Sequence, residues 1–311
     1  MCAPSRIEGS KSKDRLDMDS REIINKTMDL DDLKSDEASA IVEELNSLIK
    51  KLRAMNLKIS SWAGRLDSRE HIDPGERINR GYGYKSIEGA ADDNSFPWFL
   101  YWEIVWVVLN GGFKPGDTVL DLGGSSSLFS YYLASKGLDI TAIELKRELV
   151  DNANLAAKRT GWKLKNYVMD MRELSFDLKF DHVTSMSVYH ILPVHDRRLT
   201  SRTIGDLLVE GGRFSVTFDY RNPAEFRQIN SPEDLYEQFV RPSGLRIRGN
   251  RDFFDNGKNY LLHPFYYEKR LWKLKITCLI RQQFSMRDIL RTKHTNDYTF
   301  GALFLEKADG G

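Results

Sequence analysis

Apolar and polar positions along this chain follow two periods, one typical of strands and one typical of helices. Short apolar, β-prone runs that end in a polar residue lie at 118–120, 139–143, 165–169, 180–186 and 213–218. Between them, apolar residues spaced by three or four predict helices at 128–136, 146–159 and 197–208. Strands that alternate with helices predict an α/β protein with a parallel sheet.

An amphipathic segment precedes this alternating region. Residues 31–57 carry an apolar stripe from Ala38 to Met55, with acids at the start and bases at the end, as favours a helix. The stripe suits docking onto the main domain, and it also suits the seam of a homodimer. The sequence leaves both interpretations open.

The most apolar stretch is Phe96 to Asn110, which contains one acid, Glu103. Trp98, Trp102 and Trp106 step by four, so they share one helix face. The stretch is too short to span a bilayer, and no run of about 18 apolar residues occurs elsewhere. We interpret it as a buried helix whose aromatic stripe belongs to the core.

The segment from Thr118 to Tyr131 (TVLDLGGSSSLFSY) predicts strand, tight turn and helix, the opening of a nucleotide-binding βαβ unit. Gly123 and Gly124 allow close approach of the backbone to a ligand. Asp121 stands two residues before the first glycine. A carboxylate there suits a ligand that carries an amino group and no phosphate, such as S-adenosylmethionine.

With its flank, this segment (FKPGDTVLDLGG) resembles the first motif of class I S-adenosylmethionine-dependent methyltransferases, although Ser125 and Ser127 stand where that family usually has glycines. The resemblance covers about residues 96–220 and a C-terminal hairpin. It implies a seven-stranded Rossmann-like sheet with helices on both faces. It also implies that 273–280 and 298–305 form the last two strands, one of them antiparallel.

The resemblance also implies a cofactor site. Glu144, about twenty residues beyond the glycines, is expected to accept the ribose hydroxyls, and Asp170 the adenine amino group. The expected cofactor-binding residues are Asp121, Gly123, Gly124, Ser125, Glu144, Leu145, Asp170, Met171, Met186 and Ser187.

Candidate catalytic residues follow the fourth and fifth predicted strands. His190 lies one place early relative to a histidine of the family, so it is either the general base or a structural histidine. Asp219 is the second candidate base. No acid occurs at Ser185 to Ser187, which predicts a metal-independent enzyme. Residues proposed to face the substrate or to close over it are Arg80, Tyr82, Tyr84 and Tyr189.

The chain divides by composition. We expect a disordered tail at 1–20, an N-terminal helix and cap or lid segment at 21–95, and a methyltransferase domain at 96–306. An aromatic, Arg- and Asn-rich insert at about 221–272 is expected to face the substrate, and 307–311 to be a tail.

Bulk properties narrow the partners. The net charge of +1 gives no electrostatic case for nucleic acid. Cys2 and Cys278, the only cysteines, fit neither a disulfide framework nor a zinc site, and a cytoplasmic location is expected.

These patterns together predict O-methylation of a polar small molecule, such as a sugar or metabolite hydroxyl, with S-adenosylmethionine as cofactor. Two alternatives remain: a protein or RNA methyltransferase, and a non-catalytic module that binds S-adenosylmethionine and a partner.

Overall fold

The computed structural model describes residues 25–60, 66, 98–222, 229–261 and 297–309. Its strands are β1 (Lys26–Thr27), β2 (Thr118–Leu122), β3 (Asp139–Glu144), β4 (Leu164–Val168), β5 (Phe180–Ser185), β6 (Leu208–Tyr220), β7 (Arg246–Ile247), β8 (Tyr260–Leu261) and β9 (Asp297–Glu306). Its helices are η1 (Leu30–Lys34), α1 (Asp36–Ala54), α3 (Trp98–Gly111), α4 (Leu128–Ser135), α5 (Arg147–Thr160), η3 (Met171–Glu173), η4 (Tyr189–Ile191), α6 (Val194–Leu207), α7 (Pro232–Leu235), η5 (Tyr236–Val240) and α8 (Arg241–Ser243).

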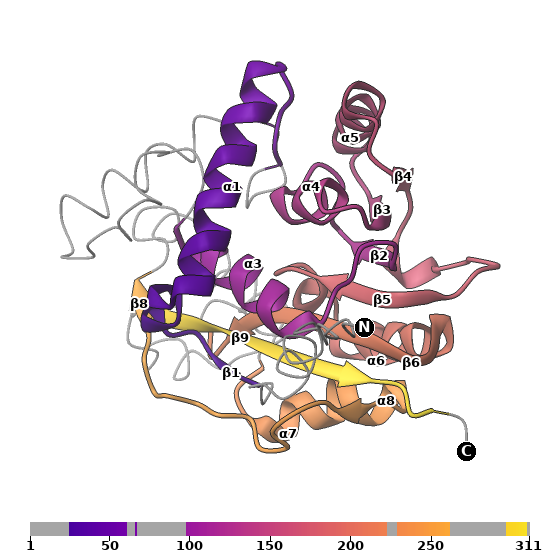
Figure 1. The fold of residues 1–311 in the computed structure, drawn as a ribbon. Coiled ribbons are helices and arrows are strands. Elements are labelled where there is room, and N and C mark those ends of the chain that lie inside the picture. The colour runs from indigo at the N-terminus through magenta and orange to yellow at the C-terminus, as the bar shows by residue number, and fades with distance from the viewer. Residues whose placement is uncertain (1–24, 61–65, 67–97, 223–228, 262–296, 310–311) are drawn as a thin grey trace, which may run out of the picture.

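The strands form one sheet in the order β1-β9-β6-β5-β2-β3-β4, with β7 and β8 also paired to β9 (Figure 1). Strands β2 to β6 are parallel, and β9 is antiparallel to β6. This confirms the predicted Rossmann-like α/β fold with an antiparallel last strand. The carboxyl ends of β2 to β6 meet at one edge, which we call the carboxyl edge.

The chain order places a topological switch at the centre of the sheet. From β2 the chain moves outward through β3 to β4, and then returns to β5 on the other side of β2. Ligands of open α/β sheets bind in the crevice outside the carboxyl ends at such a point. The turns after β2 and β5 therefore flank the expected site.

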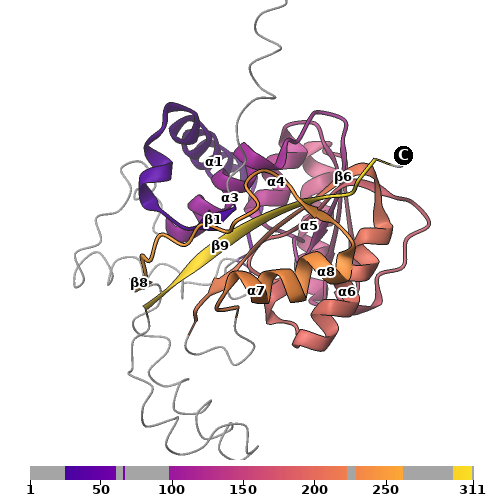
Figure 2. The same cartoon turned by 90° about the horizontal axis from the view of Figure 1, so that it is seen from below.

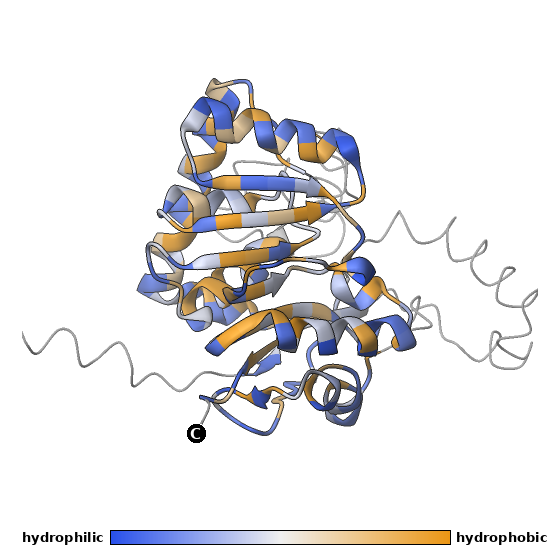
Figure 3. Ribbon diagram, turned by 90° about the vertical axis from the view of Figure 1, so that its right-hand side faces the viewer, coloured by the Kyte–Doolittle hydropathy of each residue, from blue (hydrophilic) through white to orange (hydrophobic). Residues whose placement is uncertain are grey.

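Helices cover both faces of the sheet (Figure 2). One apolar cluster joins the sheet to α1, α3, α4 and α5. The other joins it to α6 and η5. Figure 3 shows hydrophobic and polar positions alternating along these helices, as expected of helices with one buried face.

Helix α1 docks on the domain that follows it. Ser35 caps the helix, its Oγ accepting a hydrogen bond from the Ala38 amide at 3.2 Å. Leu45 and Leu52 in the stripe are fully buried, and α1 contacts α3 and α4. The apolar stripe is thus used within the chain. A homodimer through this helix stays an untested prediction.

The outer edge of β9 carries pairings that the sequence did not predict. The hairpin partner expected there, residues 273–280, lies outside the described residues. Three short strands occupy that edge: β8 at one end, β1 in the middle and β7 at the other end. Because β6 pairs with the opposite edge, β9 has partners along both edges in the described part of the chain, and the hairpin with 273–280 stays a prediction.

Hydrogen bonds of Asn25, the residue before β1, hold β1 against this edge of β9. Its side-chain amide donates to the carbonyls of Arg248 and Asn250 at 2.9 and 2.8 Å, and its Oδ1 accepts the Phe304 amide at 2.7 Å. The residue is 1% exposed. These bonds join the N-terminal segment to both the insert and the last strand.

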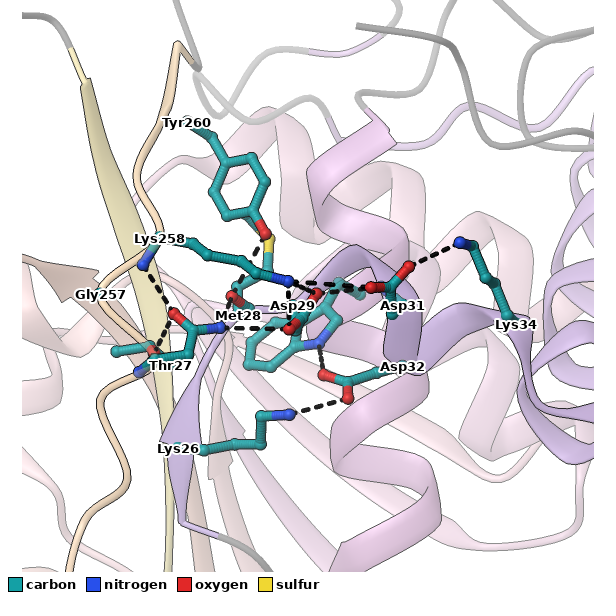
Figure 4. Close-up of polar contacts among 12 residues, drawn as sticks. Lys26, Thr27, Met28, Asp29, Asp31, Asp32, Lys34, Gly257, Lys258 and Tyr260 are labelled. Atoms are coloured by element: carbon teal, nitrogen blue, oxygen red, sulfur yellow. Dashed lines mark hydrogen bonds and ion pairs between the residues drawn. The ribbon is translucent and has the colours of Figure 1, made fainter.

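A cluster of polar and charged side chains makes further contacts between the N-terminal segment and the rest of the fold (Figure 4). Asp32 accepts hydrogen bonds from Lys26 Nζ and from the indole of Trp102, both at 2.8 Å. Lys258 Nζ lies 2.7 Å from Asp29 Oδ2. The N-terminal segment is therefore tied to α3 by the Trp102–Asp32 hydrogen bond and to the insert by the Lys258–Asp29 ion pair.

Several predictions concern residues that the structure does not describe. These are the tail at 1–20 and the lid candidates Arg80, Tyr82 and Tyr84. Among the helices that are described, none is long and apolar enough to cross a membrane.

Candidate active site

The turn after β2, Gly123 to Ser127, needs glycine at both of its first positions. Gly123 has φ +80°, and a Cβ there would lie 2.7 Å from a methyl group of Val188. A Cβ on Gly124 would lie 1.9 Å from Asp121 Oδ2. The turn is therefore packed against the β2 acid below it and against the turn after β5 beside it.

Asp121 supports this turn from inside. The carboxylate is 1% exposed and accepts hydrogen bonds from Ser130 Oγ at 2.6 Å and Thr184 Oγ1 at 2.9 Å. Burial raises its pKa to about 6, against the effect of the two hydroxyl donors. The sequence placed this carboxylate on the ligand side of the turn, whereas the structure places it in the interior.

The serines of the turn have distinct roles. Ser127 caps α4, its Oγ accepting the Ser130 amide at 2.9 Å. The Oγ of Ser126 donates to the Leu149 carbonyl at 2.6 Å. Ser125 is fully buried, and its Oγ has no hydrogen-bond partner among the described residues. An unpaired buried hydroxyl at this turn is available to a ligand.

Residues just after α1 lie over the same turn. The Ser60 amide donates to the Ser126 carbonyl at 2.7 Å. Asn152 on α5 donates to the Lys58 carbonyl and to Ser126 Oγ, both at 2.9 Å. No local sequence signal points to Asn152, because its partners Lys58 and Ser126 lie far from it in the chain.

Glu144 ends β3 beside this turn, as predicted. Its Oε1 accepts the amides of Leu145 and Lys146 at 2.8 and 3.2 Å. Partial burial raises its pKa, and the two amides oppose that shift. Leu145 next to it is 64% exposed, so an acid and an apolar side chain stand together at the carboxyl edge.

Asp170 and Met171 follow β4 at the same edge. Arg172 forms a two-pronged pair with the Asp170 carboxylate, with Nε 3.0 Å from each oxygen. This hydrogen bonding lowers the pKa of Asp170. Met171 is partly buried against the core. The sequence did not predict the ion pair between Arg172 and Asp170, because two charged residues that are two positions apart give no reliable signal of contact outside a regular helix.

The structure brings the two candidate bases together. His190 Nε2 lies 3.5 Å from Asp219 Oδ1, and Asp219 Oδ2 accepts the side-chain amide of Asn222 at 2.6 Å. His190 is 6% exposed and Asp219 8%. His190 Nδ1 is buried and has no hydrogen-bond partner among the described residues. The sequence treated these residues as alternatives, and the structure makes them a pair.

A buried arginine fixes the turn that carries His190. Arg197 on α6 is fully buried and donates to the carbonyls of His190 and Leu192. Tyr189 lies behind this turn, with its hydroxyl donating to the Arg197 carbonyl. Tyr189 is fully buried between Phe214 and Phe239. The assignment of Tyr189 to the substrate side is therefore wrong, and it is a core residue.

Glu103 on α3 reaches the same edge of the sheet, although the pattern of its helix predicted only core. The hydroxyls of Ser187 and Thr217 donate to its carboxylate, and Oε2 has no partner among the described residues. Glu103 is fully buried, which raises its pKa to about 7. The sequence signal for Glu103 was its position as the one acid in an apolar helix of 14 residues.

Residues with strained backbone conformations lie at the same edge of the sheet. In the described part of the chain, four residues other than glycine have positive φ, and three of them follow strands of the site: Ser126, Ser187 and Arg221. Such conformations cost about 1–3 kcal/mol each and concentrate at ligand sites. Ser187 is held in place by Thr217, whose Oγ1 accepts its amide at 2.9 Å.

These residues fit a nucleoside cofactor. The turn from Gly123 to Ser127, which we call the glycine–serine turn, offers a close backbone approach and an unpaired hydroxyl. Glu144 and Leu145 offer an acid beside an apolar surface. Among the described residues, no group of three or more His, Cys, Asp or Glu side chains could hold a metal ion.

Comparison with known proteins agrees with this geometry. Residues 119–212 match the family model described as a methyltransferase domain. The chain is 30% identical over 144 residues to the ubiquinone biosynthesis O-methyltransferase of Xanthomonas campestris pv. campestris (strain B100), covering 42% of this chain and 59% of that protein. The relative of the same name from Bordetella avium is 27% identical over 153 residues, covering 45% and 63%. The match thus spans about three fifths of each relative.

Solved structures are more distant. The YcgJ protein of Bacillus subtilis has a TM-score of 0.48 at 15% identity, covering 67% of this chain and 99% of its own. A TehB-like SAM-dependent methyltransferase of Corynebacterium glutamicum has a TM-score of 0.40 at 16% identity, covering 65% and 85%.

The strand order, the glycine–serine turn and the family match agree with one another. Residues 119–212 are thus similar to a methyltransferase domain, and the sheet around them has the Rossmann-like strand order expected of such a domain.

Proposed function

We propose that this chain transfers a methyl group from S-adenosylmethionine to an oxygen atom of a polar small molecule. One observation supports this most directly. The turn that carries His190 packs against the glycine–serine turn, through Val188 and Gly123. A base is thereby held next to the cofactor turn, across the switch point of the sheet.

The roles of the chain's own residues follow from their contacts. The glycine–serine turn, Glu144 and Leu145 would hold the cofactor, with Glu144 accepting the ribose hydroxyls. Asp170 would reach the adenine amino group while paired with Arg172. The sulfonium of the bound cofactor supplies an already activated methyl group, so the protein's task is alignment and removal of one proton.

His190 would take that proton. With a hydrogen on Nε2 directed at Asp219, the lone pair of Nδ1 is left to accept the hydrogen of the acceptor O–H. The O–CH₃ bond forms as the S–CH₃ bond breaks, and the proton ends on the imidazole. Asp219, itself held by Asn222, then balances the positive charge. The names of the curated relatives, which are O-methyltransferases, agree with an oxygen acceptor.

The test is a screen for methyl transfer to phenols, sugars and small alcohols, followed by His190→Ala on the acceptor found. The variant is expected to bind S-adenosylmethionine as tightly as the parent and to turn over about 10²–10⁴ times more slowly, the usual share of general acid–base catalysis. His195→Ala, on α6 and five residues further on, is the control. Full turnover in His190→Ala would make the histidine structural. Cofactor binding without turnover on any acceptor would favour a non-catalytic module.

A further inference from the structure

Glu103 is a buried acid that the proposed reaction does not use. It projects from α3, a helix that packs on both β6 and β9. Its neighbours come from three other elements. Ser187 belongs to the turn after β5, Thr217 to β6, and His190 to η4. The carboxyl group of Glu103 therefore lies near the carboxyl ends of β5, which precedes His190, and β6, which carries Asp219.

Two atoms in this cluster lack partners. Glu103 Oε2 and His190 Nδ1 are both buried, and neither has a hydrogen-bond partner among the described residues. Burying a carboxylate oxygen without a hydrogen-bond partner is unfavourable, so a purely structural acid would be expected to satisfy both oxygens. The charged groups that face Glu103 are His190, which favours its ionised form, and Asp219, which disfavours it.

We propose that Glu103 is a positioning residue of the methyl-transfer site, and that its carboxyl group gains and loses a proton in electrostatic contact with the His190–Asp219 pair. When ionised, it favours the positive charge that forms on His190 as the acceptor loses its proton. When protonated, it leaves Asp219 as the counter-charge. The proposal rests on the proposed function for its catalytic meaning, while the proton coupling itself needs no methyl acceptor.

The sign of the pH effect follows from burial. Because burial raises the pKa of Glu103 to about 7, the group is neutral in mildly acidic solution and ionised in mildly basic solution. Turnover in the parent is therefore expected to rise as the pH increases through 7. Glu103→Gln keeps the shape of the side chain and removes the charge, so its turnover should not rise as the pH increases through 7. For a coupling of one pKa unit, turnover of the variant at pH 8 should be about tenfold below that of the parent.

The decisive experiment titrates the Glu103 carboxyl carbon by ¹³C NMR in the full chain, assigned through the backbone. We expect His190→Gln to move the Glu103 midpoint to higher pH, because a neighbour that favours the ionised carboxylate is lost. Asp219→Asn should move it to lower pH, because a negative neighbour is lost. Glu44→Gln on the surface of α1 is the control and should leave it unchanged. Shifts in both directions would support the proposal.

An unchanged midpoint in both His190→Gln and Asp219→Asn would overturn it, whether or not a methyl acceptor is known. A pH–rate profile of Glu103→Gln that superimposes on the parent would also overturn it. Should Glu103→Gln fail to fold, the two titrations still decide, because Glu103 is intact in both. If no acceptor is ever methylated but the midpoints move as expected, the proposed function fails and the proton coupling stands.

Discussion

A carboxylate that accepts two backbone amides has its direction fixed before any ligand binds. Glu144 meets this condition, since the amides of Leu145 and Lys146 both reach Oε1. Such preorganisation lowers the entropy lost on binding. Its other oxygen is therefore the atom most suited to the ribose hydroxyls.

Glu144→Ala is expected to weaken S-adenosylmethionine binding by about 1.5–3 kcal/mol, the range for hydrogen bonds to a charged group. Folding should be nearly unaffected, because the side chain stands at the end of a strand and not in the core. Calorimetric titration measures the change, with Glu148→Ala, an exposed acid in the first turn of α5, as the control. Equal affinity in Glu144→Ala and the parent would show that ribose binds elsewhere.

At the residue scale, position in the chain predicted which residues reach the carboxyl edge, because strand ends follow from hydrophobic patterning. It did not predict side-chain direction. Asp121 and Tyr189 both stand beside the site in sequence, yet the structure turns them inward to Ser130 and to Arg197. Glu103 shows the converse, since it enters the site from a helix whose pattern indicated only core.

Among the elements, helix α1 carries the choice that the sequence left open. Its stripe is buried by α3 and α4 of the same chain, so each stripe residue should contribute to the stability of the monomer. A dimer seam would instead make stability depend on protein concentration.

Leu45→Ala separates the two. Leu45 is fully buried, so its loss should cost about 2–5 kcal/mol of unfolding free energy, the range for deletion of buried leucine methyls. Denaturant unfolding measures this, and Glu43→Ala on the exposed face is the control. We expect the melting temperature of parent and variant to be independent of protein concentration. A parent that melts higher at higher concentration, with the dependence abolished by Leu45→Ala, would favour the dimer.

Elements built from local signals were predicted within a few residues: β2 to β5, α3 to α6 and β9. Strand β6 begins at Leu208, before the predicted start at 213. The pairing along the outer edge of β9 was not predicted, because β1, β7 and β8 are two-residue strands with no periodicity to detect. Their pairing depends on contacts such as that of Asn25 with Phe304, which are far apart in sequence. Long-range pairing of this kind is decided by tertiary structure and not by local propensity.

For the molecule as a whole, the arrangement implies how the acceptor loses its proton. An oxygen acceptor can be activated either by a divalent metal or by a protein base. The carboxyl ends of β5 and β6 carry Ser185 to Ser187 and the single acid Asp219, and Asp219 is directed at His190. The ligands that magnesium prefers, clustered carboxylates, are not supplied by these residues.

We therefore expect methyl transfer to proceed without a divalent metal. Turnover on the acceptor identified by the screen should be unchanged by EDTA and by added magnesium, because His190 removes the proton. S-adenosylmethionine affinity measured in the same buffers controls for an effect of EDTA on cofactor binding. His190→Ala is the matched variant: if the imidazole is the base, magnesium should not restore its turnover. Activity that disappears with EDTA and returns with magnesium in the parent would show that a metal does the work assigned here to His190.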